Sequence, residues 1–247
     1  MTLPFDLSPL EALFMGGVFL LAAFVRGYSG FGFSALVVSA SALVTNPLYF
    51  VAVVMFCEFG LTFQQWRGIS RDVNWPVVGV LMLGAAVGLP IGLAIITAVS
   101  VDTVRAVVAV YVLAMCAVLL RGWTLRAQGL PITGVVGTFA GAANAVGMAG
   151  LPVATFFTAQ SMPAAAFRAT LIAYFAILDL FSAPLMWWHG LVTWDTIYTA
   201  ALSAPIIGFG GWVGGRRFLA VAPQDFRRFA IGLLAFLALL GLGKAVL

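Results

Sequence analysis

The chain alternates between long apolar runs and short polar connections. A helix that spans a membrane needs about 20 predominantly apolar residues. Runs of that kind predict six spanning helices, at about residues 47–66, 76–98, 103–121, 163–188, 195–215 and 229–244. Two further apolar regions, at about 10–44 and 130–160, are each too long for one helix. The pattern predicts an all-α integral membrane protein with two interrupted regions.

Glycines interrupt both long regions near the middle. The first break is RGYSGFG (Arg26–Gly32) and the second is NAVGMAGLP (Asn144–Pro152). The pieces around the first break are about 16 and 13 residues, which is short for a full crossing. Non-helical backbone at membrane depth survives only inside protein or beside a water-filled cavity. We therefore expect two broken hairpins, and the sequence leaves open whether they are re-entrant or fully crossing.

Matching landmarks recur 123 residues apart in the two halves of the chain. They are Gly88 and Gly211, Gly92 and Gly215, Asp102 and Asp225, and Arg105 and Arg228. A proline also opens the long helix after each broken region, at Pro47 and Pro163. We predict two homologous halves, 1–124 and 125–247, each a broken hairpin followed by three spanning helices. The aspartates are expected to cap helix N-termini, and the paired glycines to allow close helix packing.

Composition supports this class of protein. Hydrophobic residues make up 63% of the 247 residues and charged residues only 8%, against roughly 25% in soluble domains. The longest loops are about ten residues, which leaves no room for an extramembrane enzymatic module. The net charge is +4, but the basic residues lie in short loops beside apolar spans and form no nucleic-acid-binding surface.

The distribution of arginines predicts the topology. If each broken region enters and leaves on one side, the loops at 67–74, 121–129 and 216–228 share a face. That face carries Arg67, Arg71, Arg121, Arg126, Arg216, Arg217, Arg227 and Arg228, whereas the other carries Lys244, Asp6, Glu11, Asp102 and Asp195. The positive-inside rule makes the arginine face cytoplasmic and places both termini outside. Three spanning helices per half then give the two halves opposite orientations, which is an inverted repeat.

The two breaks predict an anion site at the membrane midplane. Short, glycine-interrupted segments in corresponding positions of inverted halves are typical of transporter binding sites. Second arms starting near Phe31 and Leu151 would direct free N–H groups and a partial positive charge to the centre. Arg26 adds a full charge, and Ser29 and Asn144 add hydrogen-bonding groups. The alternative is that Arg26 lies at a cytoplasmic turn and anchors the chain to lipid headgroups.

Two acidic residues lie deep in predicted spans. Glu58 is eleven residues past Pro47, and Asp179 is sixteen past Pro163. A carboxyl group at the bilayer centre is a functional hypothesis by default. Each is a candidate proton carrier that stays neutral until the transport cycle ionises it; the alternative is a structural partner for an arginine such as Arg168. That arginine could extend to the interface or reach the tip of the second hairpin.

Other chemistry has little support. His189 is the only histidine, so a histidine-rich metal site is excluded, and Cys57 and Cys116 are expected to be packing residues. No phosphate-binding loop, nucleophile elbow or CxxC motif occurs, so we expect neither an enzyme nor a bound cofactor or metal.

The segments around both breaks resemble the TauE/SafE sulfite exporter family, also called the TSUP permeases. RGYSGFGFSALVV is similar to the signature of that family's first repeat. GTFAGAANAVGMAGLPVATFF, followed by FRATLIAYF, is similar to the second. The resemblance covers nearly the whole chain. It implies transport of sulfite, organosulfonates or related small anions across a bacterial plasma membrane without ATP hydrolysis.

The resemblance also assigns site residues. Positions that match the family are Gly27, Ser29, Gly30, Gly32, Gly147, Gly150, Pro152 and Arg168. Ala149 stands where a glycine is common and Leu151 where a proline is common, and with Met148 they make this side more apolar. An organic anion with an apolar part is thus as plausible a substrate as sulfite.

We therefore expect a secondary transporter of small anions, with protons as the coupling ion and access alternating as one half or hairpin rocks against the other. The expected substrate-binding residues are Arg26, Gly27, Tyr28, Ser29, Gly30, Phe31, Gly32, Asn144, Gly147, Met148, Gly150, Leu151 and Arg168. Glu58 and Asp179 are the expected proton-coupling residues. An anion channel and a structural subunit of a membrane complex are the alternatives. Direction of transport and assembly into a homo-oligomer are left open.

Overall fold

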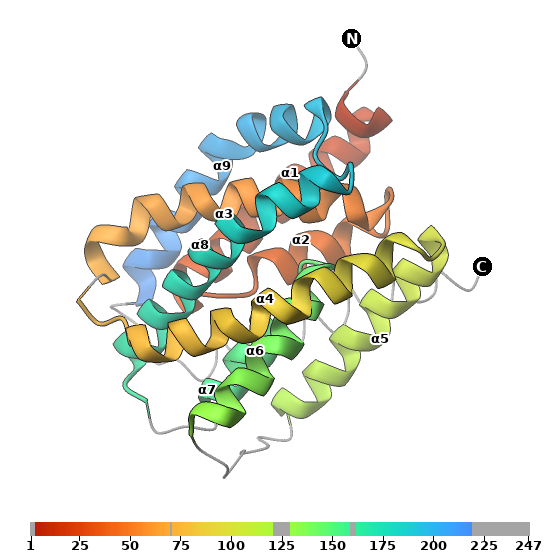
Figure 1. Cartoon of the computed structure of the whole chain (residues 1–247). Helices are drawn as coiled ribbons and strands as arrows, with labels where there is room; N and C mark the ends of the chain where they lie inside the picture. The colour runs from red at the N-terminus through yellow and green to blue at the C-terminus, as the bar shows by residue number, and fades with distance from the viewer. Residues whose placement is uncertain (1–2, 70, 121–128, 159–161, 219–247) are drawn as a thin grey trace.

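The structure, a computed structural model, describes residues 3–69, 71–120, 129–158 and 162–218. These residues form helices and contain no strand (Figure 1). The elements are η1 (Pro4–Asp6), α1 (Pro9–Ser29), α2 (Phe33–Ser41), α3 (Pro47–Ile69), α4 (Trp75–Thr97), α5 (Val101–Leu120), α6 (Leu130–Asn144), α7 (Gly150–Thr158), α8 (Ala164–Trp188) and α9 (Trp194–Phe218). The predicted all-α class is confirmed. The predicted helix at 229–244, with Asp225 and Arg228, lies outside the described residues.

Five of the described helices are long and apolar enough to cross a membrane: α1, α3, α4, α8 and α9. Large apolar side chains cover their outer surfaces, as shown by the exposed Phe63, Leu83 and Leu202. A soluble protein would not expose so many large apolar side chains, whereas lipid accommodates them. The described part of the chain is therefore built as a multi-pass membrane protein.

The first broken region differs in length from the prediction, whereas the second has the two short arms expected. The first break is only Gly30–Gly32, and α1 before it has 21 residues, so the expected short first arm is wrong. Arg26 and Gly27 continue the helix because α1 ends only at Gly30, whose φ is +83°. Its second arm, α2, has nine residues. In the second region α6 has 15 residues and α7 nine, so both arms are short.

Local signals explain several helix starts. Ser8 and Glu11 form a reciprocal capping box at the start of α1, which satisfies two N–H groups that the helix leaves free. Asn74 accepts a hydrogen bond from the Val77 N–H at the start of α4. The predicted cap at Asp102 is wrong: the Ser100 hydroxyl accepts the Thr103 N–H, and Asp102 pairs with Arg105 in the first turn of α5.

Glycines bring α4 into backbone contact with α6. A side chain on Gly84, Gly88 or Gly92 of α4 would collide with backbone atoms of α6. Gly137 and Gly141 of α6 meet the α4 backbone in the same way. Without Cβ atoms the two helices approach closely, as small residues allow in membranes. The close-packing prediction for Gly88 and Gly92 is confirmed.

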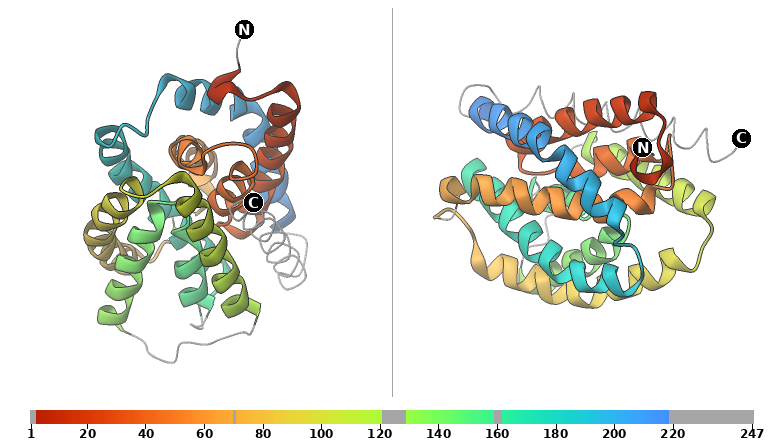
Figure 2. Two further views of the ribbon diagram at one scale, coloured as in Figure 1. Left: turned by 90° about the vertical axis from the view of Figure 1, so that its right-hand side faces the viewer. Right: turned by 90° about the horizontal axis from the view of Figure 1, so that it is seen from above.

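The same type of contact joins α1 to α9. Gly210 and Gly214 of α9 lie against the Leu20 and Phe24 carbonyls of α1, and Gly27 of α1 lies against Gly211. The first arm of each broken region thus packs on a long helix of the other half. Viewed nearly along the helices, α1 and α9 lie on one side of the molecule and α4 and α6 on the other, with α3 between them (Figure 2).

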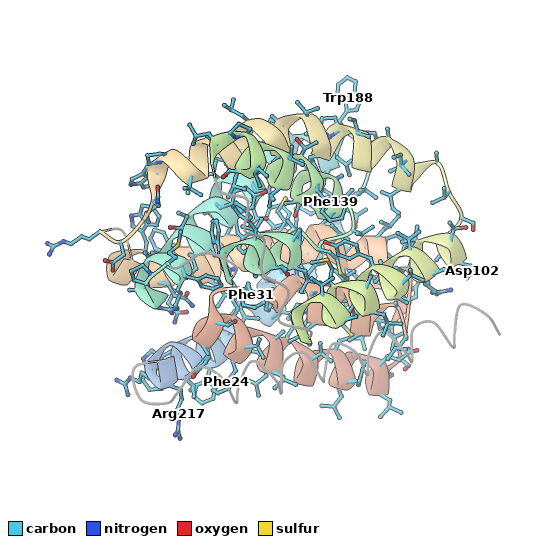
Figure 3. The ribbon with its side chains drawn as sticks, turned by 90° about the horizontal axis from the view of Figure 1, so that it is seen from below. Phe24, Phe31, Asp102, Phe139, Trp188 and Arg217 are labelled. Atoms are coloured by element: carbon cyan, nitrogen blue, oxygen red, sulfur yellow. The ribbon has the colours of Figure 1, made fainter. Side chains whose placement is uncertain are left out.

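Charged side chains lie at opposite ends of the helices. Arg217, at the end of α9, and Asp102, at the start of α5, project from opposite ends of the molecule (Figure 3). Trp188 projects outward from the end of α8 and is 88% exposed. Arg121, Arg126, Arg227, Arg228 and Lys244 lie outside the described residues.

Candidate functional site

Arg26 lies in the last turn of α1 and is completely buried, with 0% of its surface exposed. This burial excludes the alternative that it anchors the chain to lipid headgroups. A buried guanidinium needs compensation for the water it has lost. Its position next to the first break predicts that the compensation comes from within the protein core.

Neighbours from three helices surround this guanidinium. Nη1 lies 3.5 Å from Glu58 Oε2 and 3.4 Å from the Gly30 carbonyl oxygen, to which it donates. Nη2 donates to Thr62 Oγ1 at 2.9 Å, and the Phe175 ring centroid lies 5.8 Å from Cζ. Nε has no hydrogen-bond partner among the described residues. Arg26 therefore keeps donor capacity beyond its one ion pair.

Glu58 contributes the only carboxylate paired with Arg26 among the described residues. It is 4% exposed and projects from the middle of α3. The prediction that a deep carboxyl could pair with an arginine is confirmed for Glu58, but with Arg26 and not with the suggested Arg168.

Arg168, near the start of α8, contacts the end of α1. Its Nη2 donates a 2.7 Å hydrogen bond to the Gly27 carbonyl oxygen. Its side chain also lies close to Gly30 and Gly215. The sequence placed Arg168 at the interface or at the second hairpin, and did not predict this contact with the first.

Asp179 is the second deep carboxyl. It lies in α8 and is 7% exposed, and its Oδ2 atom has no hydrogen-bond partner among the described residues. An unpartnered oxygen in a buried position is costly unless it is protonated or gains a partner during function. Asp179 therefore remains a candidate for the predicted proton-coupling role.

The second break begins with Asn144, whose Nδ2 donates to Ser182 Oγ at 2.9 Å. Gly147 has a φ of +70°, and the Met148 carbonyl accepts a hydrogen bond from the Tyr111 hydroxyl. Gly150 then starts α7 close to the Phe175 and Phe31 side chains. The second break therefore meets the first through Phe31.

A small cavity of about 10 Å³ lies between the second break, α2, α3 and α8. Its lining is Ser34, Val51, Val54, Met55, Glu58, Asn144, Gly147, Ala149, Gly150, Phe175, Asp179 and Met186. That volume holds about one water molecule. Sulfite is larger, so the site must widen before such an anion enters.

The predicted site residues divide into two groups. Asn144, Gly147 and Gly150 line the cavity, and Arg26 contacts two of its lining residues, Glu58 and Phe175. The other predicted residues lie around it without lining it: Gly27, Tyr28, Ser29, Gly30, Phe31, Gly32, Met148, Leu151 and Arg168. Ser29 closes the first break locally, because its hydroxyl lies 2.8 Å from the carbonyl oxygens of both Val25 and Phe31 and can donate its one proton to either.

The sequence analysis did not predict which side chains surround the Glu58 and Asp179 carboxyls. Thr62, Met55, Val54 and Val51 lie at helical intervals from Glu58. Phe175 and Met186 lie four and seven positions from Asp179. Side chains three, four and seven apart share one helix face, so the two carboxyls could have located these residues.

Aromatic rings pack at the end of the site near Arg168. Phe31 from the first break and Phe157 from α7 both contact Phe167, edge to face, at centroid distances of 6.4 and 6.0 Å. Phe31 lies within the helix bundle in Figure 3. These rings join the first break, α7 and α8 at that end of the helices.

The cluster offers no metal site. No group of three or more histidine, cysteine, aspartate or glutamate side chains comes together among the described residues. The Cys57 thiol, beside Glu58, lies 3.3 Å from the Ser203 hydroxyl and is buried, as expected for a packing residue. The side chain of Cys116 lies outside the described part.

Two broken helices that meet at a buried, charged cavity in a multi-pass helix bundle define a membrane transport protein. The family model for the sulfite exporter TauE/SafE matches residues 15–241. The chain belongs to the TauE/SafE sulfite exporter family, a family of membrane transporters. No curated protein and no solved structure matches the chain.

Proposed function

We propose that the chain is a secondary transporter of small anions, such as sulfite, organosulfonates or related organic anions, and that it binds them at Arg26. One observation carries the proposal: a fully buried arginine lies beside the cavity, and among the described residues it has a single ion pair, at 3.5 Å, and no partner for its Nε. A guanidinium forms bidentate hydrogen bonds with two oxygens of one oxyanion, as it does with carboxylates and phosphates. Arg26 retains donors for such a ligand.

Helix ends add to this positive potential. The N-terminus of α7, at Gly150, lines the cavity, and Ser34 near the start of α2 does so as well. The first N–H groups of a helix have no partner within it and carry about half a positive charge. Both helix starts thus support binding of an anion between the two breaks, as the sequence predicted.

The lining also bears on the substrate. Val51, Val54, Met55 and Met186 form the apolar part of this lining. Methionine side chains adapt to irregular apolar ligands. An organic anion would place its charged group towards Arg26 and its apolar part against these side chains.

Alternating access requires that two bodies move about the cavity. The packing of α1 on α9 and of α6 on α4 supports an inverted repeat. In each contact the first arm of one half packs on a long helix of the other half, and α1 corresponds to α6 as α4 corresponds to α9. This packing also suggests that the moving bodies are mixed: α1, α2, α3 and α9 form one, and α4, α6, α7 and α8 the other. This division replaces the simpler expectation that one half of the sequence rocks against the other.

Proton coupling is part of the proposal. Glu58 and Asp179 line one cavity from the two proposed bodies. A carboxyl that ionises in one state and is protonated in another moves a proton through the cycle. We place the arginine-rich end on the cytoplasmic side of a bacterial plasma membrane, in agreement with the positive-inside rule.

Counterflow in proteoliposomes tests this function. Vesicles preloaded with unlabelled sulfite should accumulate external radiolabelled sulfite against its gradient, and Arg26→Ala should lose at least 90% of the initial rate. Arg217→Ala, at the exposed end of α9, is the control and should retain the wild-type rate. Flux without counterflow would indicate a channel, and flux unchanged by Arg26→Ala would reject the proposed site.

A further inference from the structure

We infer that Glu58 acts as a tethered anion. Its carboxylate holds the Arg26 guanidinium when no substrate is present, and a substrate anion replaces it only after Glu58 accepts a proton. This inference rests on the proposed function and gives it a coupling mechanism. It follows from the contacts of Arg26, from the charges beside the cavity and from the different positions of the two carboxyls.

The contacts of Arg26 show that the carboxylate is the replaceable neighbour. Gly30 belongs to the break that follows Arg26 on the same helix, and Thr62 is a neutral hydroxyl. Glu58 alone among them brings a negative charge, and it does so through one 3.5 Å contact, longer than a usual charge-assisted hydrogen bond. Protonation would remove that charge while the two neutral contacts persist.

The charges beside the cavity do not favour a second anion next to ionised Glu58. Glu58 forms part of the cavity wall, so an anion that reaches Arg26 from the cavity comes next to this carboxylate. Two anions against one buried guanidinium would leave a net negative charge that the protein core disfavours. This charge argument makes substrate and ionised Glu58 mutually exclusive.

Asp179 cannot play this part in the observed arrangement. It lines the same cavity, but from α8, and no arginine forms an ion pair with it among the described residues. A carboxyl that merely tunes the charge of the cavity would behave alike at either position. The two positions therefore provide a matched comparison between direct competition and general electrostatics.

No other described charged group is placed to replace Glu58. Of the helices packed on α3, α1 presents Arg26 to it and α8 presents Asp179, while the described part of α2 carries no ionisable side chain. Several other ionisable groups on the packed helices have contacts elsewhere: Arg168 with the Gly27 carbonyl, Arg105 with Asp102, Asp195 with the Phe5 amide, Arg216 with the Trp212 ring, Tyr111 with the Met148 carbonyl and Cys57 with Ser203. The buried Tyr174 hydroxyl of α8 has no hydrogen-bond partner among the described residues.

The test uses methanesulfonate and ethanesulfonate, whose charge is constant between pH 5 and 9, so that any pH dependence comes from the protein. Calorimetry on the purified protein should show affinity falling by about tenfold per pH unit over the range in which Glu58 is ionised in the anion-free protein. In a weak buffer, wild type should take up one proton per anion bound in that range. Glu58→Gln should bind without this dependence, and Asp179→Asn should keep it.

The outcomes separate the inference from the function on which it rests. Binding to wild type that is independent of pH and takes up no proton would overturn the tethered anion and leave the anion site intact. Equal loss of pH dependence in Glu58→Gln and Asp179→Asn would also overturn it. If Glu58→Gln fails to fold, the proton uptake of the wild type alone tests the tethered anion. If neither sulfonate nor sulfite binds at any pH, the proposed function fails and the inference fails with it.

Discussion

The guanidinium of Arg168 holds the carbonyl of Gly27 through a 2.7 Å hydrogen bond that joins the start of α8 to the end of α1. These residues are 141 positions apart and belong to the two proposed bodies. A carbonyl at a helix C-terminus carries partial negative charge and favours a cation. The contact thus ties the two bodies at one end of the cavity, next to the rings of Phe31 and Phe167.

Removing the hydrogen bond between Arg168 and the Gly27 carbonyl should open that end of the site. Arg168→Gln should raise the labelling rate of a cysteine placed at Ala149, in a Cys57→Ala, Cys116→Ala background, by several fold with a membrane-permeant maleimide. The physical reason is that a charge-assisted hydrogen bond contributes about 1.5–3 kcal/mol to the closed state. Arg217→Gln is the control; equal labelling in both variants would show that Arg168 does not hold the site closed.

Because Arg26 pairs with Glu58, replacing both residues should restore stability without restoring transport. Arg26→Met should lower the free energy of unfolding by about 3–5 kcal/mol, because it leaves a buried carboxyl without its cation. Adding Glu58→Met should restore most of that loss, while anion transport stays absent. Thermal melting in detergent, with transport assays in parallel, checks both parts. A double variant as unstable as the single one would contradict a paired role.

Close packing of α4 on α6 predicts a large effect from one methyl group. Gly88→Ala should destabilise the protein by about 1–3 kcal/mol, because the new Cβ collides with the Thr138 carbonyl and the helices must separate. Gly79→Ala in the same helix meets no atom within 4 Å and should be neutral or slightly stabilising. Melting temperatures of the two variants measure the difference; similar values would disprove the contact.

Two separate effects should destabilise the protein when Gly30 gains a side chain. Its φ of +83° makes any side chain costly by about 1–2 kcal/mol, and a Cβ there would also press on Arg168 Cγ at 3.0 Å. Gly190, with φ +70° and no atom within 4 Å, has only the first effect. Gly30→Ala should therefore lower the melting temperature more than Gly190→Ala. Equal shifts in melting temperature would show that the Arg168 side chain moves aside without cost.

Local signals located the elements well. Pro47 and Pro163 marked helix starts because proline fits the beginning of a helix and interrupts its interior. Glycine clusters marked both breaks for similarly local reasons. The length of α1 was misjudged because Arg26 and Gly27 look like break residues, whereas the chain leaves the helix only where φ becomes positive at Gly30.

Contacts between distant segments could not be predicted from local sequence signals. Periodicity shows which face of α3 carries Glu58, but it does not show that α1 lies opposite that face. The pairing of Glu58 with Arg26, and that of Arg168 with Gly27, depends on how the two halves interlock. Family resemblance supplied the transport class, while the role of each carboxyl depends on positions that only the three-dimensional arrangement reveals.

The contact of α1 with α9 has a consequence for biosynthesis. Leu20 and Gly210 are 190 positions apart, so the first helix is synthesised long before its glycine-bearing partner. At roughly 5–20 residues per second, translation leaves about 10–40 s between the two. During that interval the newly inserted α1 must hold Arg26 in the membrane without the helix on which it finally packs. A ribosome that stalls before α9 would therefore leave a first helix exposed to quality-control proteases.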